Sequence, residues 1–338
     1  MEDFLVFSDV HLHNWRYGSQ QDRSGFNSRL LDQVAVMAQI YGYAKEHDIP
    51  VIVFCGDLFH THQSLHIGPL AVAHRFFTAW AREGKITWML PGNHDMADQQ
   101  GKLTSLESLK HQVSVFDEMD LSNLKFCFLP YTADQIKIRY FLDHVPDDAF
   151  AFMHSGVQRA AVNHKGFILN DEVLDPTWIP DRIKHTFIGH YHSLQQTSKW
   201  TIPGSPMHHG WGDAGDSRGF LHVTPDPFRI LPISLDFPQF KIMDGTKEIL
   251  KSDVAGHYIK LTGIESDQVF ADRLRNDGAR TVEFEVSGKV QAPELPGQQA
   301  NVTINNVVRK FIDIKGLPQD LIDLGTQIME GNSANTLR

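Results

Sequence analysis

The amino-acid sequence predicts an α/β fold, and two features of the chain support this class. Five short apolar runs each have the pattern of a buried strand and each ends at a polar cluster; they cover residues 4–7, 51–54, 86–90, 150–153 and 186–188. Helix-like periodicity separates the first three runs, which gives a βαβαβ order. Because loops at the carboxyl ends of parallel strands meet over one crevice, we expect the five polar clusters to converge there.

The expected elements follow one another through the first half of the chain. After the first strand, residues 15–26 are polar and are expected to form a loop beside the site. Apolar residues then recur at spacings of three and four, which predicts an amphipathic helix that carries Leu30, Val34, Met37, Tyr41 and Ala44. Pro50 precedes the second strand, and a second helix is expected over residues 69–83. A further strand is expected near residues 126–129, with longer irregular segments beyond it.

The pattern changes after Phe240. Residues 258–261 and 282–286 alternate like half-exposed strands, and residues 267–274 between them are helix-like. These features predict a small α+β module, so we place a domain boundary between residues 238 and 239.

The last part of the chain, residues 291–338, is expected to be a linker followed by a helix. Residues 291–299 are rich in Pro, Gly and Gln, which is typical of linkers. Gly316-Leu317-Pro318 predicts a helix start, because Pro is tolerated in the first turn. Apolar residues at helical spacing follow, at Leu321, Leu324 and Ile328. So short a helix must bury its apolar face, either on a partner or on this chain's own surface.

Bulk composition is that of an ordinary globular protein with about two domains. Hydrophobic residues make up 41% of the 338 residues and charged residues 21%. No apolar stretch approaches the roughly 18 residues that a membrane span needs, and the chain runs directly into its first strand without room for a signal peptide. Cys55 and Cys127 lie in apolar runs and are expected to be reduced interior thiols. These features together predict a cytoplasmic enzyme.

The polar clusters contain the residue types that bind metal ions. In chain order they are Asp9-Val10-His11, Gly56-Asp57, Gly92-Asn93-His94-Asp95, His154 and Gly189-His190-Tyr191-His192. Oxygen and imidazole ligands from several loops are what a two-metal hydrolytic centre requires. Such a centre needs one carboxylate shared by both ions, and Asp57 is the natural candidate.

The order of these clusters resembles that of the calcineurin-like metallophosphoesterases, and within them the SbcD-type nuclease subunits of double-strand-break repair. Two motifs point to the SbcD-type subunits within this family. One is Gly56-Asp57-Leu58-Phe59-His60, with a histidine three positions after the aspartate, and the other is Pro203-Gly204-Ser205-Pro206. The resemblance covers about residues 1–235. It implies two packed sheets flanked by helices, followed by a small capping domain that contacts DNA.

The resemblance also implies a role for each site residue. Asp9, His11 and His192 would complete a first metal site, and Asn93, His154 and His190 a second; Mn²⁺ suits these donors best, with Fe²⁺ or Zn²⁺ as alternatives. His94 would protonate the leaving oxygen. His60 would contact a phosphate oxygen or position His94, and Asp95 would either orient the His94 ring or cap the next turn. The remaining histidines of these loops are interpreted as ordinary loop residues. His208 and His209 are interpreted as part of a surface loop, with lining of the groove as the alternative.

The leading functional expectation is a nuclease subunit that cuts duplex DNA as an exonuclease and single strands as an endonuclease. An SbcC-type coiled-coil ATPase would bind the carboxy-terminal helix. A homodimer is expected through residues 69–83, unless Leu70, Phe76, Phe77 and Trp80 simply pack on the sheet. A net charge of −10 argues against tight DNA binding by this chain alone. The alternatives are a small-molecule phosphodiesterase or phosphomonoesterase, and an inactive metal-binding scaffold.

Overall fold

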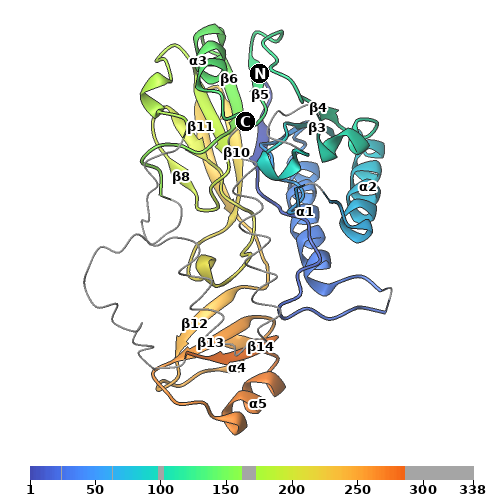
Figure 1. The fold of residues 1–338 in the computed structure, drawn as a ribbon, viewed down its shortest axis with the longest axis vertical. Helices are drawn as coiled ribbons and strands as arrows, with labels where there is room; N and C mark the ends of the chain where they lie inside the picture. The colour runs from blue at the N-terminus through green and yellow to red at the C-terminus, as the bar shows by residue number, and fades with distance from the viewer. Residues whose placement is uncertain (24, 63, 98–102, 162–172, 286–338) are drawn as a thin grey trace, which may run out of the picture. The chain divides into compact units, whose positions relative to one another are not determined.

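The computed structural model describes residues 1–285, apart from residues 24, 63, 98–102 and 162–172. The linker and helix expected after residue 290 therefore lie outside the described residues. Within the described part, two sheets pack face to face and a third, smaller sheet follows them in the chain (Figure 1).

The first sheet contains the expected βαβαβ unit. Its strand order is β11-β10-β1-β2-β3-β4, with bounds β1 Phe4–Phe7, β2 Val51–Phe54, β3 Ile86–Met89, β4 Ser114–Val115, β10 Gly219–Pro225 and β11 Phe228–Ser234. Strands β1 to β4 are parallel, and β10 and β11 add an antiparallel edge. The connecting helices α1 (Ser28–Glu46) and α2 (Ile67–Arg82) cover one face (Figure 1).

The second sheet has the strand order β5-β6-β7-β9-β8. Its strands are β5 Phe126–Leu129, β6 Phe150–His154, β7 His185–Gly189, β8 Gln195–Gln196 and β9 Trp200–Ile202. All neighbours are parallel except β8 and β9. Helix α3 (Gln135–His144), which the sequence did not predict, connects β5 to β6 and packs on this sheet. Short 3₁₀ helices occur at Asn93–Asp95, Ser105–Leu109, Pro176–Trp178 and Trp211–Asp213.

Three apolar layers show that this is a two-sheet sandwich flanked by helices, as predicted. Phe4 and Val6 of β1 face the second sheet and pack among Phe150, Phe152 and Phe187. The alternate residues Leu5 and Phe7 point the other way, into the layer under α1 and α2. Both faces of β1 are covered, which explains why its sequence is apolar throughout.

A small three-stranded module follows the sandwich. Its parallel strands are β12 Phe240–Asp244, β13 Tyr258–Thr262 and β14 Thr281–Phe284, with helices α4 Lys251–Val254 and α5 Gln268–Asn276. It has an apolar cluster of its own that includes Ile259, Leu261 and Leu274. Arg280 joins it to α1 through both oxygens of Asp32. Residues 1–287 form one compact unit, so a separate capping domain that begins at residue 239 stays a prediction.

The bulky residues of α2 pack within the sandwich. Phe76 is 8% exposed and Phe77 is 1% exposed, and Leu70 and Trp80 lie partly buried against the same cluster. Packing of Phe76 and Phe77 against the sheet agrees with the alternative reading of this helix, Leu70 and Trp80 are only partly buried, and dimerisation stays a prediction. Both cysteines are buried free thiols, as expected. Among the described residues, no helix is long and apolar enough to cross a membrane.

Candidate metal centre

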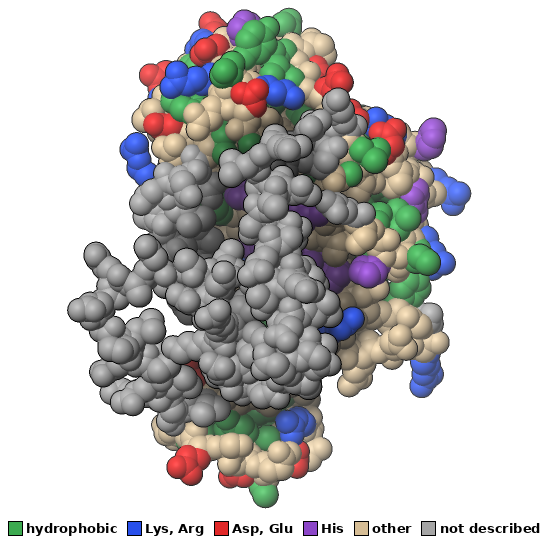
Figure 2. Space-filling view, viewed as in Figure 1, with side chains coloured by type: hydrophobic (Ala, Val, Ile, Leu, Met, Phe, Trp, Pro, Cys, Tyr) green, Lys and Arg blue, Asp and Glu red, His purple; other side chains and the backbone are tan. Residues whose placement is uncertain are grey.

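Strand ends from both sheets bring the seven predicted ligands together. Asp9 and His11 follow β1, Asp57 follows β2, and Asn93 lies in the turn after β3. The second sheet supplies His154 at the end of β6, and His190 and His192 at and after the end of β7. Figure 2 shows histidine side chains, in purple, near the middle of one face of the molecule.

The first group of donor atoms surrounds His11. Its Nε2 lies 3.9 Å from Asp9 Oδ1, 3.6 Å from Asp57 Oδ2 and 3.2 Å from His192 Nε2. Donor atoms that share one ion at about 2.1 Å lie about 3–4 Å from one another. These four side chains therefore have the spacing of one metal site, which we call site 1.

The second group surrounds Asn93. Its Oδ1 lies 3.0 Å from His154 Nε2 and 3.0 Å from His190 Nδ1. Asp57 Oδ2 is 3.5 Å from His154 Nε2, so this one oxygen borders both groups. We call this second group site 2; Asp57 lies where a carboxylate shared by the two sites would have to lie.

Left-handed backbone conformations aim the ligands inward. Asp9, His11, Asp57 and His190 have φ angles of 55°, 51°, 62° and 123°. Such angles are uncommon for residues other than glycine. The backbone strain that they cause persists at functional sites where the surrounding structure holds it in place. Each residue ends or follows a strand, so the turn directs its side chain across the sheet edge and not along the strand.

Gly92 leaves room for the shared carboxylate. A Cβ added at this residue would collide with Asp57 Oδ1 and would lie 2.7 Å from His154 Cε1. We expect Gly92→Ala to lower metal content and thermal stability together, because Asp57 must move. Gly42→Ala is the control: its position in α1 is open, and alanine there should stabilise by about 0.5–1 kcal/mol. Thermal melts and metal analysis measure both, and an unchanged Gly92→Ala protein would contradict the packing argument.

The electrostatics of the centre suit cations. Burial raises the pKa of Asp9 to about 7. It also raises the pKa of Asp57, with a further contribution from the nearby Asp9 and Asp95. Burial, and then neighbouring histidines, lower the pKa of His11 and His154, so these imidazoles are neutral and can act as ligands. Asp9 Oδ1 is buried without a hydrogen-bond partner in the described part of the chain. Divalent ions would satisfy this oxygen and offset the crowded carboxylates.

Backbone groups orient the ligand rings. His154 Nδ1 lies 2.7 Å from the Cys55 carbonyl, so Nδ1–H donates to it and leaves the Nε2 lone pair for site 2. The amides of His94 and His190 donate to Asp57 Oδ1 and Asp9 Oδ2, at 2.8 and 3.1 Å. Each carboxylate therefore has one oxygen fixed by an amide and the other directed at a metal site.

His94 has the arrangement of a proton donor. Its Nδ1 is 2.6 Å from the His60 carbonyl, so Nδ1–H donates there and Nε2 is the nitrogen that can reach a substrate. Burial lowers the pKa of His94, while the His60 carbonyl opposes this by stabilising the charged ring. The exposed His62 stacks on the same ring at 4.2 Å.

His60 and Asp95 support the loop after β2. The His60 ring places Nδ1 3.4 Å from His11 Nδ1, and burial lowers its pKa to about 4. The Asp95 carboxylate accepts hydrogen bonds from the amides of Asp57, Leu58, Phe59 and Gly92, at 2.8–3.2 Å. Asp95 thus fixes the Asp57 loop, whereas the His94 ring is held by His60.

For His208 and His209 the surface-loop interpretation was wrong, and the position of His209 agrees with the alternative that it lines the groove. His208 is 2% exposed, and its ring joins the carbonyl of Asp216 to the amide of Phe240. The His209 ring lies about 5 Å from the rings of His11 and His192, and its Nε2 is 3.1 Å from the Asp9 carbonyl. The strand β9 and the turn after it, which the sequence did not reveal, fold these residues back onto the centre.

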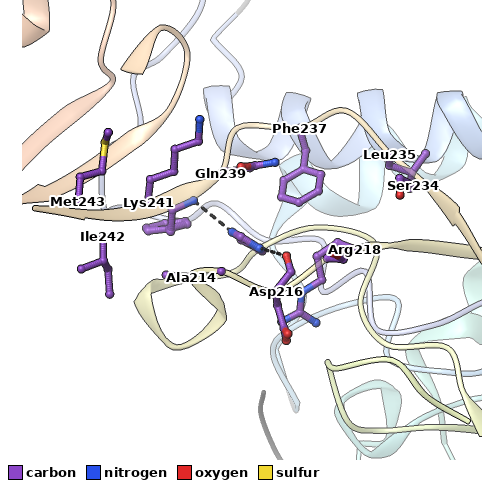
Figure 3. Close-up of a pocket in the computed structure, with 14 residues that line it drawn as sticks. Ala214, Asp216, Arg218, Ser234, Leu235, Phe237, Gln239, Lys241, Ile242 and Met243 are labelled. Carbon is purple, nitrogen blue, oxygen red and sulfur yellow. Dashed lines mark hydrogen bonds and ion pairs between the residues drawn. The ribbon is translucent and has the colours of Figure 1, made fainter. Parts of the chain in front are cut away.

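A cavity of about 450 Å³ lies apart from the metal-site ligands (Figure 3). Segments 214–218 and 234–243 line it together with His208, and Arg218, Phe237 and Met243 are among the labelled side chains. None of its lining residues is one of the seven predicted ligands. The volume of a cavity therefore does not locate the metal centre, whereas the clustering of carboxylate, amide and imidazole donor atoms does.

Residues 3–194, which contain all seven ligands, match the family model described as "Calcineurin-like phosphoesterase". The chain belongs to this family. Protein 244L of Invertebrate iridescent virus 6, named provisionally as a phosphoesterase, is 26% identical over 193 residues, which cover 53% of this chain and 66% of that protein. The crystal structure of the Pseudomonas putida nuclease MPE aligns with a TM-score of 0.32 and 12% identity over 68% of this chain and 87% of that one. So low a score supports no inference about activity.

Proposed function

We propose that this member of the family is a DNA nuclease of the SbcD type that hydrolyses phosphodiester bonds with two Mn²⁺ ions, Fe²⁺ or Zn²⁺ being the alternatives. The observation that carries a catalytic role is the placement of the His94 ring beside His11, with Nδ1 held by the His60 carbonyl and no hydrogen-bond partner for Nε2 among the described residues. A passive metal-binding scaffold has no need for such a proton donor.

The chain's own residues account for orientation and proton transfer. When bound, two divalent ions polarise a phosphoryl oxygen and lower the pKa of a water molecule. Asp57 Oδ2 fixes the spacing between the two sites, since it borders donors of each. His94 gives the proton on Nε2 to the leaving oxygen, and the His60 carbonyl stabilises its charged form beforehand.

An extended substrate is favoured by the surface near the centre. Trp15, whose ring lies 4.4 Å from that of His60, begins a segment that also exposes Arg16 and Tyr17. Across from Tyr17, the Lys260 ammonium group lies 4.3 Å from the Trp211 ring. Exposed cationic and aromatic side chains such as Arg16 and Tyr17 suit contacts with a nucleic-acid strand. The net charge of −10 leads us to include an SbcC-type ATPase and a second copy of this chain as proposed partners.

The test is a set of parallel reactions with Mn²⁺ on labelled linear duplex DNA, labelled single-stranded DNA and nitrophenyl phosphodiester and monoester substrates. Each is run with and without a coiled-coil ATPase encoded in the same genome. Cleavage of DNA supports the proposal. Hydrolysis restricted to the nitrophenyl substrates would favour a small-molecule phosphoesterase. Two bound ions without hydrolysis of any substrate would indicate a scaffold.

A further inference from the structure

His209 links the loop of a metal ligand to the interior of the protein. Its Nε2 is 3.1 Å from the Asp9 carbonyl, so Nε2–H donates to the peptide that follows Asp9. That peptide needs support, because Asp9 has a φ of 55°. The Asp9 Oδ1 atom is buried and has no hydrogen-bond partner in the described part of the chain. The His190 amide holds the other oxygen of this carboxylate, and the backbone that His209 holds contributes to where Oδ1 lies relative to site 1.

Arg29 in turn holds His209. This α1 residue is 3% exposed, and its Nη2 donates to the His209 carbonyl at 2.8 Å. Its Nη1 donates to the Tyr17 carbonyl at 3.3 Å. One planar guanidinium thus joins the segment after β1 to the turn after β9, a geometry that lysine cannot reproduce.

The three-stranded module packs on the other side of the same guanidinium. The Cζ atom of Arg29 lies 5.2 Å from the Phe240 ring and 5.5 Å from the Tyr258 ring. It also lies 5.2 Å from the Trp15 ring. The contacts with Phe240 of β12 and Tyr258 of β13 hold the guanidinium group in place, as expected for cation–π packing of a buried arginine.

We propose that Arg29 and His209 are positioning residues that couple the three-stranded module to metal site 1. Contacts run from Phe240 and Tyr258 to Arg29, from Arg29 to His209, and from His209 to the Asp9 backbone. The site 2 ligand His154 is held by a different contact, its hydrogen bond to the Cys55 carbonyl. Loss of the coupling should therefore weaken one of the two sites selectively.

Metal titration of the full-length apo protein tests this, without any substrate. In His209→Leu, which keeps bulk but has no donor, we expect the Mn²⁺ dissociation constant of site 1 to rise by about 10–100-fold, as for other residues that orient ligands. Site 2 should be unchanged. Arg29→Met should have the same selective effect. His209→Gln, whose amide nitrogen can replace Nε2–H, should restore wild-type binding.

His185→Leu is the matched control, because it also removes a buried imidazole, but one whose ring bonds Thr201 and lies outside this chain of contacts. It should leave both Mn²⁺ affinities unchanged. Equal weakening by His185→Leu would show a general effect of losing a buried histidine and would overturn the proposal. So would wild-type binding of both ions by a folded His209→Leu protein, with folding checked by the apo melting temperature. Neither readout depends on whether the protein cuts DNA.

Discussion

Replacing His94 with alanine should slow DNA hydrolysis by about 10²–10⁴-fold, the usual contribution of a positioned proton donor. Both metal ions should remain bound, because alanine retains the amide that donates to Asp57 Oδ1 at 2.8 Å. Any hydrolysis of a nitrophenyl phosphodiester should fall much less, since nitrophenolate leaves readily without a proton. Rates on the two substrates, measured together with metal content, check this result.

His62→Ala provides a matched control for the His94 variant. His62 stacks on the His94 ring at 4.2 Å but is exposed, so its removal should change the DNA rate only slightly. A His94→Ala enzyme with full activity, or one that has lost both ions, would refute the proton-donor role. An equal loss of rate on both substrates would indicate a disturbed metal centre instead.

Asp57→Asn should abolish activity and reduce metal occupancy at both sites, since Asp57 Oδ2 borders donors of each. Its effect on stability should change sign with the metal. Without ions, burial and the neighbouring Asp9 and Asp95 raise the pKa of Asp57, so the charged form destabilises the fold at neutral pH. The neutral amide should then stabilise the apo protein by about 1–3 kcal/mol.

With Mn²⁺ present, the wild-type protein should be the more stable of the two, because ion binding adds to its folding free energy. Thermal melts with chelator and with Mn²⁺ give both comparisons. Asp32→Asn, which alters a carboxylate that pairs with Arg280 and is not one of the seven predicted ligands, controls for the loss of any partly buried charge. A variant that retains both ions would show that Asp57 is not shared.

The strands and helices of the sandwich were predictable where the sequence has a clear local pattern, either an apolar run followed by a polar cluster or apolar residues at helical spacing. Strand β1 combines an apolar run with a polar cluster directly after it, and α1 has apolar residues at helical spacing. Strand β11 gave no such signal, because its residues are mostly exposed and Pro232 interrupts it. Its place at the sheet edge explains both features, since an edge strand tolerates proline and water.

Site residues were predictable when their roles depend on neighbours in the sequence, and not when their roles depend on contacts with distant residues. Asp9 and His11 lie in one short motif, and the structure places both in site 1. The role of His209 depends on a contact between residues 200 positions apart, which no short motif encodes. The sequence also left open whether Asp95 orients a ring or supports a turn. Three of its four amide donors, those of Asp57, Leu58 and Phe59, are brought near it by the packing of β2 beside β3, and only Gly92 is close in the sequence.

Each metal site draws its donors from both sheets of the sandwich. Site 1 takes Asp9 and His11 from the first sheet and His192 from the second, and site 2 takes Asn93 from the first and His154 and His190 from the second. An ion bound in either position would therefore connect two layers whose packing is otherwise apolar. A chelator that removes the ions would therefore also lower the stability of the packing between the two sheets.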